Sequence, residues 1–318
     1  MATLEKQHSQ SGPAQSQSKS WLPIPEPVKK LFDSFPVVTY PAQQLPAGCP
    51  RNEKLPTLWI FTKGDGLDAN GRELMSFNPS CLKWQTYLRL SSLPYRAVPS
   101  SNHSSPSGAL PFLIAPENSE TIPSNKLMQW IKKHGNPPEE DLEDPEIKAL
   151  LALVETKLRD AWLYTLYLTP VFWSLTQDLY TSTSSSLARL YLSHELQQAA
   201  RQELANTRPL LAHSLLTAPL SYTASYSSSI APSATGATSP AEEIYADLES
   251  ALQALETILG DDNWFHGADR PGYFDAAVFG YVELMGMEGL RETRLGEVVA
   301  GCRGLQRWRE GVRGRAGW

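Results

Sequence analysis

Three cysteines carry the most reactive side chains of this sequence. Cys81 lies early in a predicted helix, where the positive end of the helix dipole can lower the pKa of a thiol and make it nucleophilic. It has no partner in a Cys-x-x-Cys arrangement, and an isolated cysteine more often serves as a small buried apolar residue. We therefore expect Cys81 to be buried and inert, and we assign no role to Cys49 or Cys302.

The other polar residues do not form a pattern typical of a metal or cofactor site. Asp68 and Gly71 resemble part of a calcium loop, but with Gly71 at the sixth position the first and twelfth positions are Gly66 and Phe77. A plain Asn-Gly turn is the better interpretation. The six histidines are scattered, and no phosphate-binding loop, zinc-protease motif or dinucleotide fingerprint is present. The sequence predicts no catalytic residue, no metal and no cofactor.

A turn rich in serine and glycine leads into a short apolar strand at residues 105–114. The turn contains Gly108, and Pro111 stands at the start of the strand, where a proline cannot donate to a sheet. One explanation is a tight turn with a cis peptide bond before Pro111. The other is a loop and an edge strand with a trans proline. The stretch by itself leaves both open, so the neighbouring elements decide.

Composition and charge narrow the class of protein. The chain has 318 residues, 41% hydrophobic and 19% charged, which suits a soluble globular core with room for two domains. A net charge of −6 argues against nucleic acid as a partner. The odd, widely spaced cysteines indicate a reducing compartment. We expect no transmembrane helix and no secretory signal, and residues 1–20 lack the arginines of a mitochondrial presequence.

Residues 57–135 have the pattern of a small α/β module. A buried strand at 57–62 is followed by a helix that Asn78 and a proline begin and that ends near residue 90. Strands are expected at 95–98, 110–114 and 120–122, and a last helix runs from residue 124 to Gly135. This order is βαβ followed by ββα. In this setting we favour the cis form at Pro111.

The chain from residue 140 to 318 is predicted to be helical. Apolar residues at helical spacing begin after Asp144, and Pro170 breaks or kinks that helix. A second helix is expected at about 185–213, and a third begins at Pro240. An almost wholly apolar helix starts near Asp275 and is expected to be central and buried, and a final helix carries a basic tail.

Three segments fall outside these domains. Residues 1–20 contain nine Ser or Gln and are predicted to be a disordered tail. Residues 21–56 combine prolines with large apolar residues and are interpreted as an extended arm that packs on its own domain or on a partner. Residues 217–240 contain 11 Ser or Thr and are interpreted as a low-complexity, mobile insertion.

A thioredoxin-like α/β domain followed by an all-helical domain resembles the glutathione-transferase architecture. That family places a cis-proline before the third strand, as at Pro111, and an aspartate that caps a buried helix, as at Asp275. The turn 105–111, Cys81 and the run 274–280 together resemble the metaxins. The resemblance covers roughly residues 57–135 and 241–312. It implies structural roles for Pro111, Gly108 and Asp275.

The metaxin resemblance implies a non-enzymatic subunit of the fungal mitochondrial outer-membrane sorting and assembly machinery. Such a subunit lies peripherally on the cytosolic face and helps to recognise, insert or release β-barrel precursors. Its implied partners are a membrane-embedded β-barrel subunit, a second metaxin-like subunit and the precursors. The residues that we expect to meet a partner belong to the arm and to the basic last helix: Trp21, Phe32, Phe35, Arg303 and Arg307. The same basic helix could meet anionic lipid, although a solvated face that complements the helix dipole is the simpler interpretation.

Two other functions remain open from the sequence. A glutathione transferase needs a Tyr, Ser or Cys just after the first strand, where this chain has Thr62, a poor substitute. That family also grips the γ-glutamyl end with an acidic residue or Gln followed by Ser, and here the positions are Pro123 and Ser124. Ser124 can still bind an anion at a helix N-terminus. The second alternative is a soluble scaffold that uses a transferase-like domain for assembly.

Overall fold

The computed structural model describes residues 54–69, 71–116, 120–180, 185–217 and 239–318. These residues all belong to one unit of the chain, Gly48–Trp318. The predicted tail at 1–20, nearly all of the arm at 21–56 and the insertion at 217–240 lie outside them. Within the described residues, none of the helices has the length and apolar character needed to cross a membrane.

A four-stranded mixed sheet forms the centre of the N-terminal half, in the order β2-β1-β3-β4. The strands are β1 (Thr57–Ile60), β2 (Arg96–Pro99), β3 (Phe112–Ile114) and β4 (Thr121–Pro123). β1 pairs parallel to β2 and antiparallel to β3, and β3 pairs antiparallel to β4. Two helices complete the module, α2 (Pro79–Leu90) and α3 (Ser124–His134). The predicted βαβ and ββα order is confirmed, and with it the thioredoxin-like domain.

The turn before β3 has the predicted backbone. The peptide bond between Leu110 and Pro111 is cis, and Gly108 has a φ of +74°, a conformation that glycine adopts without steric cost. Pro111 is buried at the start of the strand, whereas Gly108 is exposed in the turn. The cis interpretation at Pro111 is therefore confirmed.

The C-terminal half is entirely helical, as predicted. One nearly continuous helix comprises α4 (Pro145–Leu153), a π-helical segment η2 (Val154–Leu158), α5 (Arg159–Leu163) and a second π-helical segment η3 (Tyr164–Leu168). The helices that follow are α6 (Trp173–Tyr180), α7 (Ser186–Thr207), α8 (Ala212–Thr217), α9 (Pro240–Leu259), α10 (Tyr273–Met285), α11 (Arg294–Gly301) and α12 (Arg303–Ala316). Among the residues that the structure describes, short 3-10 helices lie in the N-terminal half at η1 (Asn102–Ser104) and in the C-terminal half at η4 (Pro170–Phe172), η6 (Phe265–Gly267) and η7 (Glu288–Leu290).

Two helix predictions need correction. The helix expected at 185–213 is two helices, because α7 ends at Thr207 and Arg208 leaves the helical conformation with φ −130° and ψ 73°. A residue that precedes a proline, here Pro209, is sterically disfavoured in the helical region. The short helix α11 was not predicted; Thr293 caps it by accepting from the Gly296 N–H.

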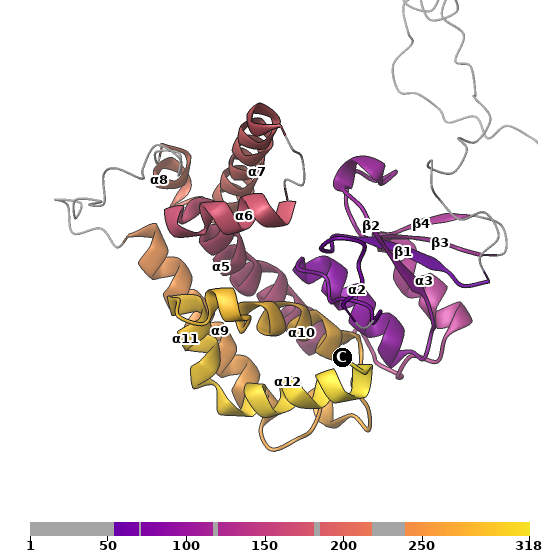
Figure 1. The fold of residues 1–318 in the computed structure, drawn as a ribbon. Helices are drawn as coiled ribbons and strands as arrows, with labels where there is room; N and C mark the ends of the chain where they lie inside the picture. Colours follow the sequence, from indigo (N-terminus) through magenta and orange to yellow (C-terminus); the bar gives the residue numbers. More distant parts are fainter. Residues whose placement is uncertain (1–53, 70, 117–119, 181–184, 218–238) are drawn as a thin grey trace, which may run out of the picture. The chain divides into compact units, whose positions relative to one another are not determined.

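Helix α10 is the buried centre of the helical half, as expected. Its residues from Phe274 to Val282 are all buried. It lies against α2 of the other half (Figure 1), and a Cβ at Gly280 would be 2.6 Å from the Pro79 carbonyl oxygen. A side chain at this position would collide with backbone, so Gly280 allows the two helices to approach closely.

The N-terminus of α10 is held by two carboxylates. Asp275 accepts hydrogen bonds from the Gly272 N–H (3.0 Å), the Phe265 N–H (3.3 Å) and the Trp308 indole N–H (2.7 Å). Glu140, from the segment between α3 and α4, accepts from the first two N–H groups of the helix, at 2.8 and 3.1 Å. The predicted capping role of Asp275 is present, together with a second acid that the sequence did not indicate.

We expect Asp275→Ala to lower the free energy of unfolding by at least about 3 kcal/mol. Three donors would lose their acceptor in a buried site, and each unsatisfied donor costs about 1–3 kcal/mol. Urea unfolding followed by circular dichroism measures the loss. Asp144→Ala is the matched control, because Asp144 caps α4 at a more exposed site and should cost only about 1 kcal/mol. Equal losses for the two variants would contradict the assignment.

Stability should also depend on pH through Asp275. Burial raises its pKa from 3.8 to about 6, and burial also raises the pKa of Glu140. Because the folded state holds this proton more tightly than the unfolded state, the stabilisation is fully present below pH about 4 and is lost as pH rises through about 6. The stability of the wild type relative to Asp275→Asn should fall by about 3 kcal/mol between pH 4 and 7. Urea titrations across this range measure the change, and a difference that grows with pH would contradict it.

Candidate functional site

The end of β1 is the position at which the resemblance places the group that handles a thiolate. Thr62 follows the strand there and is half-buried. Three aromatic rings cover the neighbouring space: Phe61, Phe77 and Tyr180, with centroids 5.1–6.0 Å apart. Tyr180 comes from α6, and its hydroxyl accepts from the side-chain amide of Asn78 at 3.3 Å. The helical half thus packs one aromatic ring, that of Tyr180, against this end of the sheet.

Cys81 lies beneath the same cluster and is fully buried. Burial raises the pKa of its thiol to about 12, against weaker lowering by hydrogen bonds to the Phe61 backbone and to Ser76. The predicted burial of Cys81 is therefore confirmed, and because helix-dipole activation needs an accessible thiolate, we expect the thiol to be inert. Cys302 is also buried, and burial raises its pKa to about 11. Cys49 lies outside the described residues.

The turn before Pro111 is engaged within the chain. The Leu110 N–H, beside the cis-proline, donates to the side-chain oxygen of Asn102 at 3.0 Å. Asn102 begins the 3-10 helix η1. A ligand that paired with this amide would have to displace an intramolecular hydrogen bond. The turn therefore has a cis-proline, and the backbone donor beside that proline already has a partner in Asn102.

The N-terminus of α3 is the remaining part of the expected ligand site. Pro123 occupies the capping position, where it supplies no side-chain hydrogen bond, and Ser124 is half-buried in the first turn. The first N–H groups of such a helix attract anions. Ser124 therefore retains the general chemistry that the sequence indicated, without the acidic or Gln residue that would complete it.

The predicted basic surface lies on α12. Arg313 forms an ion pair with Glu283 at 3.2 Å, and Arg309 pairs with Glu283 at 3.5 Å and with Glu310 at 3.0 Å, so both arginines have acidic partners within the fold. Arg303 and Arg307 are exposed, as a role in partner binding requires. The other three predicted contact residues, which are Trp21, Phe32 and Phe35, lie outside the described residues.

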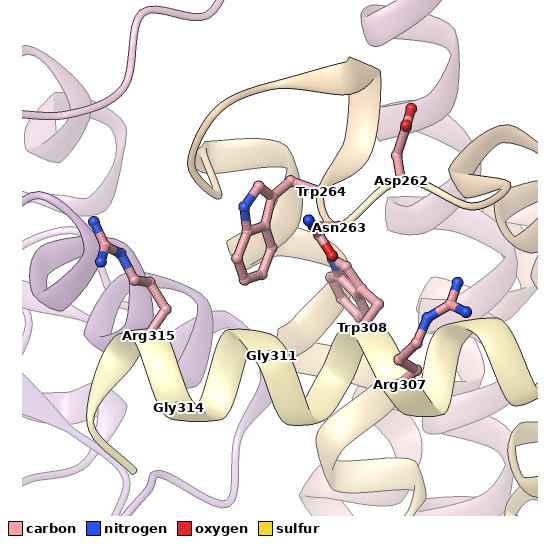
Figure 2. A pocket seen from close by; sticks show the side chains of 8 residues that line it. All are labelled: Asp262, Asn263, Trp264, Arg307, Trp308, Gly311, Gly314 and Arg315. Carbon is pink, nitrogen blue, oxygen red and sulfur yellow. The ribbon is translucent and has the colours of Figure 1, made fainter.

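Arg307 lines a groove of about 380 Å³ between α12 and the loop at 261–264. Figure 2 shows the indole of Trp264 between Arg307 and Arg315 along the helix, with glycines below. Beneath the groove, the Trp308 indole N–H binds Asp275, which ties the groove to the cap of α10. The structure thus brings one predicted partner residue into a concave surface and places Arg303 outside it.

Comparison with known families agrees with this architecture. The family model described as the glutathione S-transferase N-terminal domain matches residues 79–172, and the model described as the glutathione S-transferase C-terminal domain matches residues 248–312. Both the order of the domains and the mixed sheet are those of that fold. The chain has a glutathione-transferase-like fold. Each of the two models matches one of its halves.

Solved structures of this fold are similar to the glutathione-transferase-like chain at low identity. The β-etherase LigF from Sphingobium sp. strain SYK-6 is 14% identical, with a TM-score of 0.47 and coverage of 81% of this chain and 94% of that one. Glutathione transferase GSTFuA3 from Phanerochaete chrysosporium is 13% identical, with a TM-score of 0.45 and coverage of 79% and 97%. Glutaredoxin 2 from Salmonella typhimurium, in complex with glutathione, is 14% identical, with a TM-score of 0.47 and coverage of 83% and 96%. No curated protein matches the sequence.

Three residues of these sites were missed from the sequence of this glutathione-transferase-like protein. Asn102 lies in a polar loop eight residues before its partner, and nothing in the loop marks it as an acceptor. Tyr180 reaches the sheet from a helix about 100 positions later in the chain, so no local pattern connects them. Trp264 lies in the loop before α10, and nothing in that loop indicates that it meets α12. The contacts of Tyr180 and Trp264 join segments far apart in the sequence, whereas that of Asn102 is a local contact without a recognisable pattern.

We expect Cys81 to resist alkylation in the folded protein. Its complete burial and raised pKa leave little accessible thiolate. Treatment with iodoacetamide at pH 8, followed by peptide mass spectrometry, should label Cys81 in urea and leave it unlabelled in native buffer. The urea sample is the matched control for intrinsic reactivity. Native labelling at the rate of a small thiol would contradict the assignment of Cys81 as inert.

Proposed function

We propose that this chain is a non-enzymatic, metaxin-like subunit of the mitochondrial outer-membrane sorting and assembly machinery. It associates peripherally with the cytosolic face of the membrane and binds the membrane-embedded β-barrel subunit and a second metaxin-like subunit. In that place it assists the recognition, insertion or release of β-barrel precursors. The proposal joins the metaxin resemblance of the two motifs to a glutathione-transferase-like fold.

One observation carries the proposal: the backbone amide beside the cis-proline is engaged internally. The Leu110 N–H donates to the side-chain oxygen of Asn102 at 3.0 Å, so a ligand that paired with this amide would first have to displace Asn102. The position just after the first strand holds Thr62, a poor substitute for the Tyr, Ser or Cys that a transferase uses there. A fold that satisfies this amide with its own side chain is better suited to present surfaces to other proteins. This supports a binding role over catalysis.

A glutathione-dependent transferase is the second candidate. The matches to both transferase domain families and the uncapped N-terminus of α3 at Ser124 favour it. A soluble transferase-like scaffold is a third function, which fractionation to the soluble phase would favour. The three differ in what the chain binds, so affinity experiments separate them.

The tagged chain, purified from mitochondria at moderate salt, should bring a β-barrel membrane protein with it. Crosslinking with mass spectrometry then maps the contact surface on each partner. An untagged preparation controls for carry-over of abundant outer-membrane proteins. Recovery of the chain free of any barrel protein would contradict the proposal.

The same preparation should pass through immobilised glutathione without retention, because Asn102 occupies the amide that a γ-glutamyl peptide would use. The matched variant is Asn102→Ala, which frees that amide. Retention of the wild-type chain that Ser124→Ala abolishes would overturn the non-enzymatic assignment and favour the transferase.

A further inference from the structure

Two glycines of α12, Gly311 and Gly314, line the floor of the groove between this helix and the loop at 261–264. The contact with Trp264 explains Gly311, because a Cβ there would lie 3.2 Å from the indole Cη2. Gly314 also lines the groove and is exposed, but a Cβ there would meet nothing within 4 Å. Since glycine is unfavourable inside a helix, no contact within the fold explains Gly314. A bare helix surface at this point lets another backbone approach closely.

Positive charge stands at both ends of this floor. Arg307 and Arg315 are exposed and line the groove, and among the described residues no carboxylate lies within ion-pair distance of either. The Arg307 guanidinium donates a long hydrogen bond, of 3.4 Å, to the Gly260 carbonyl oxygen. The two guanidinium groups contrast with Arg309 and Arg313, whose charges are already paired with Glu283.

One acidic residue also lines the groove, but its charge is directed elsewhere. Figure 2 shows the Asp262 carboxylate pointing away from α12. Its Oδ2 lies near Gly267, 3.7 Å from where a Cβ of that residue would be. The surface that faces outward along α12 is therefore cationic at its ends and aromatic at its centre, where Trp264 lies.

We propose that this groove binds an extended acidic peptide segment of a partner protein. Arg307 and Arg315 are eight helical residues apart, about 12 Å along the axis. In an extended chain, residues four apart on one face are separated by about 13 Å, and the residue midway between them points to the same face. Two carboxylates four residues apart meet the two arginines, and an apolar or aromatic side chain between them packs on Trp264 over the glycine floor.

A peptide fits this surface better than a membrane does. The site is a groove between α12 and the loop at 261–264, so a narrow extended segment can reach its floor, whereas a broad lipid surface meets only its rim. The chain as a whole carries a net charge of −6. A short acidic segment in the groove lies near Arg307 and Arg315 and away from the negative charge carried by the rest of the protein. The inference rests on the groove alone and does not depend on the proposed function.

Fluorescein-labelled peptides test the proposal by anisotropy with the purified full chain. The probe has the core Glu-Ser-Phe-Ser-Glu within Gly-Ser flanks. The first control replaces both Glu by Lys, and the second has the same composition with the two Glu adjacent. The probe should bind at least about tenfold more tightly than either control, and more weakly as salt is raised. Equal binding of the three peptides would overturn the proposal.

Variants of the chain locate the binding. The double variant Arg307→Glu/Arg315→Glu should weaken probe binding by about tenfold or more. Lys63→Glu/Arg291→Glu makes the same change in net charge at exposed positions outside the groove and should leave binding unchanged. Equal weakening by both pairs would show a nonspecific charge effect and overturn the site.

Two further variants separate obstruction from misfolding. Gly314→Trp fills the floor and should abolish binding, whereas Gly301→Trp, at another exposed helical glycine with open space around it, should not. Circular dichroism confirms that both variants are folded. A last experiment uses liposomes that contain phosphatidylserine. If the chain binds these liposomes but not the peptide, and Arg307→Glu/Arg315→Glu removes the liposome binding, the groove binds a membrane surface and the peptide proposal is wrong. The assay contains no mitochondrial component, so its failure leaves the proposed function untouched.

Discussion

The N-terminus of α10 is the point on which the rest of this structure depends. A helix buried along almost its whole length begins with N–H groups that have no partner in the helix. Asp275 and Glu140 supply the acceptors. Because Glu140 comes from the segment between the two halves, and Trp308 from α12 also binds Asp275, one cap fixes the connecting segment and the last helix in place.

The same arrangement explains why the two candidate surfaces have different characters. Near the sheet, α10 approaches α2 closely at Gly280, and Tyr180 packs on Phe61 and Phe77. At α12, the hydrogen bond from the Trp308 indole to Asp275 holds the helix against the core, and the outer face of the helix lines a cationic groove.

The charge on the outer face of α12 differs in sign from the net charge of the protein. A net charge of −6 predicts a poor fit to anionic partners, yet three arginines of α12 are exposed on one helix. Glu283 removes two other arginines from that surface by pairing with both. What remains is a small, directional positive site on an acidic protein, which favours selective recognition over general attraction.

The sequence by itself determined the order of the elements, because caps, turns and apolar spacing are local signals. It favoured the cis bond before Pro111 through the order of the neighbouring elements, and the capping role of Asp275 through the resemblance. The structure decided that Asn102 accepts from the Leu110 N–H, because neither residue type marks that contact within the loop. It also decided that Glu140 shares the cap of α10 and that Trp264 meets Gly311, because these contacts join distant segments through packing, which has no periodic signature in the chain. The end of α7 before Arg208 could have been predicted from Pro209, because the residue before a proline disfavours the helical conformation. It was missed because the apolar pattern continues beyond the proline.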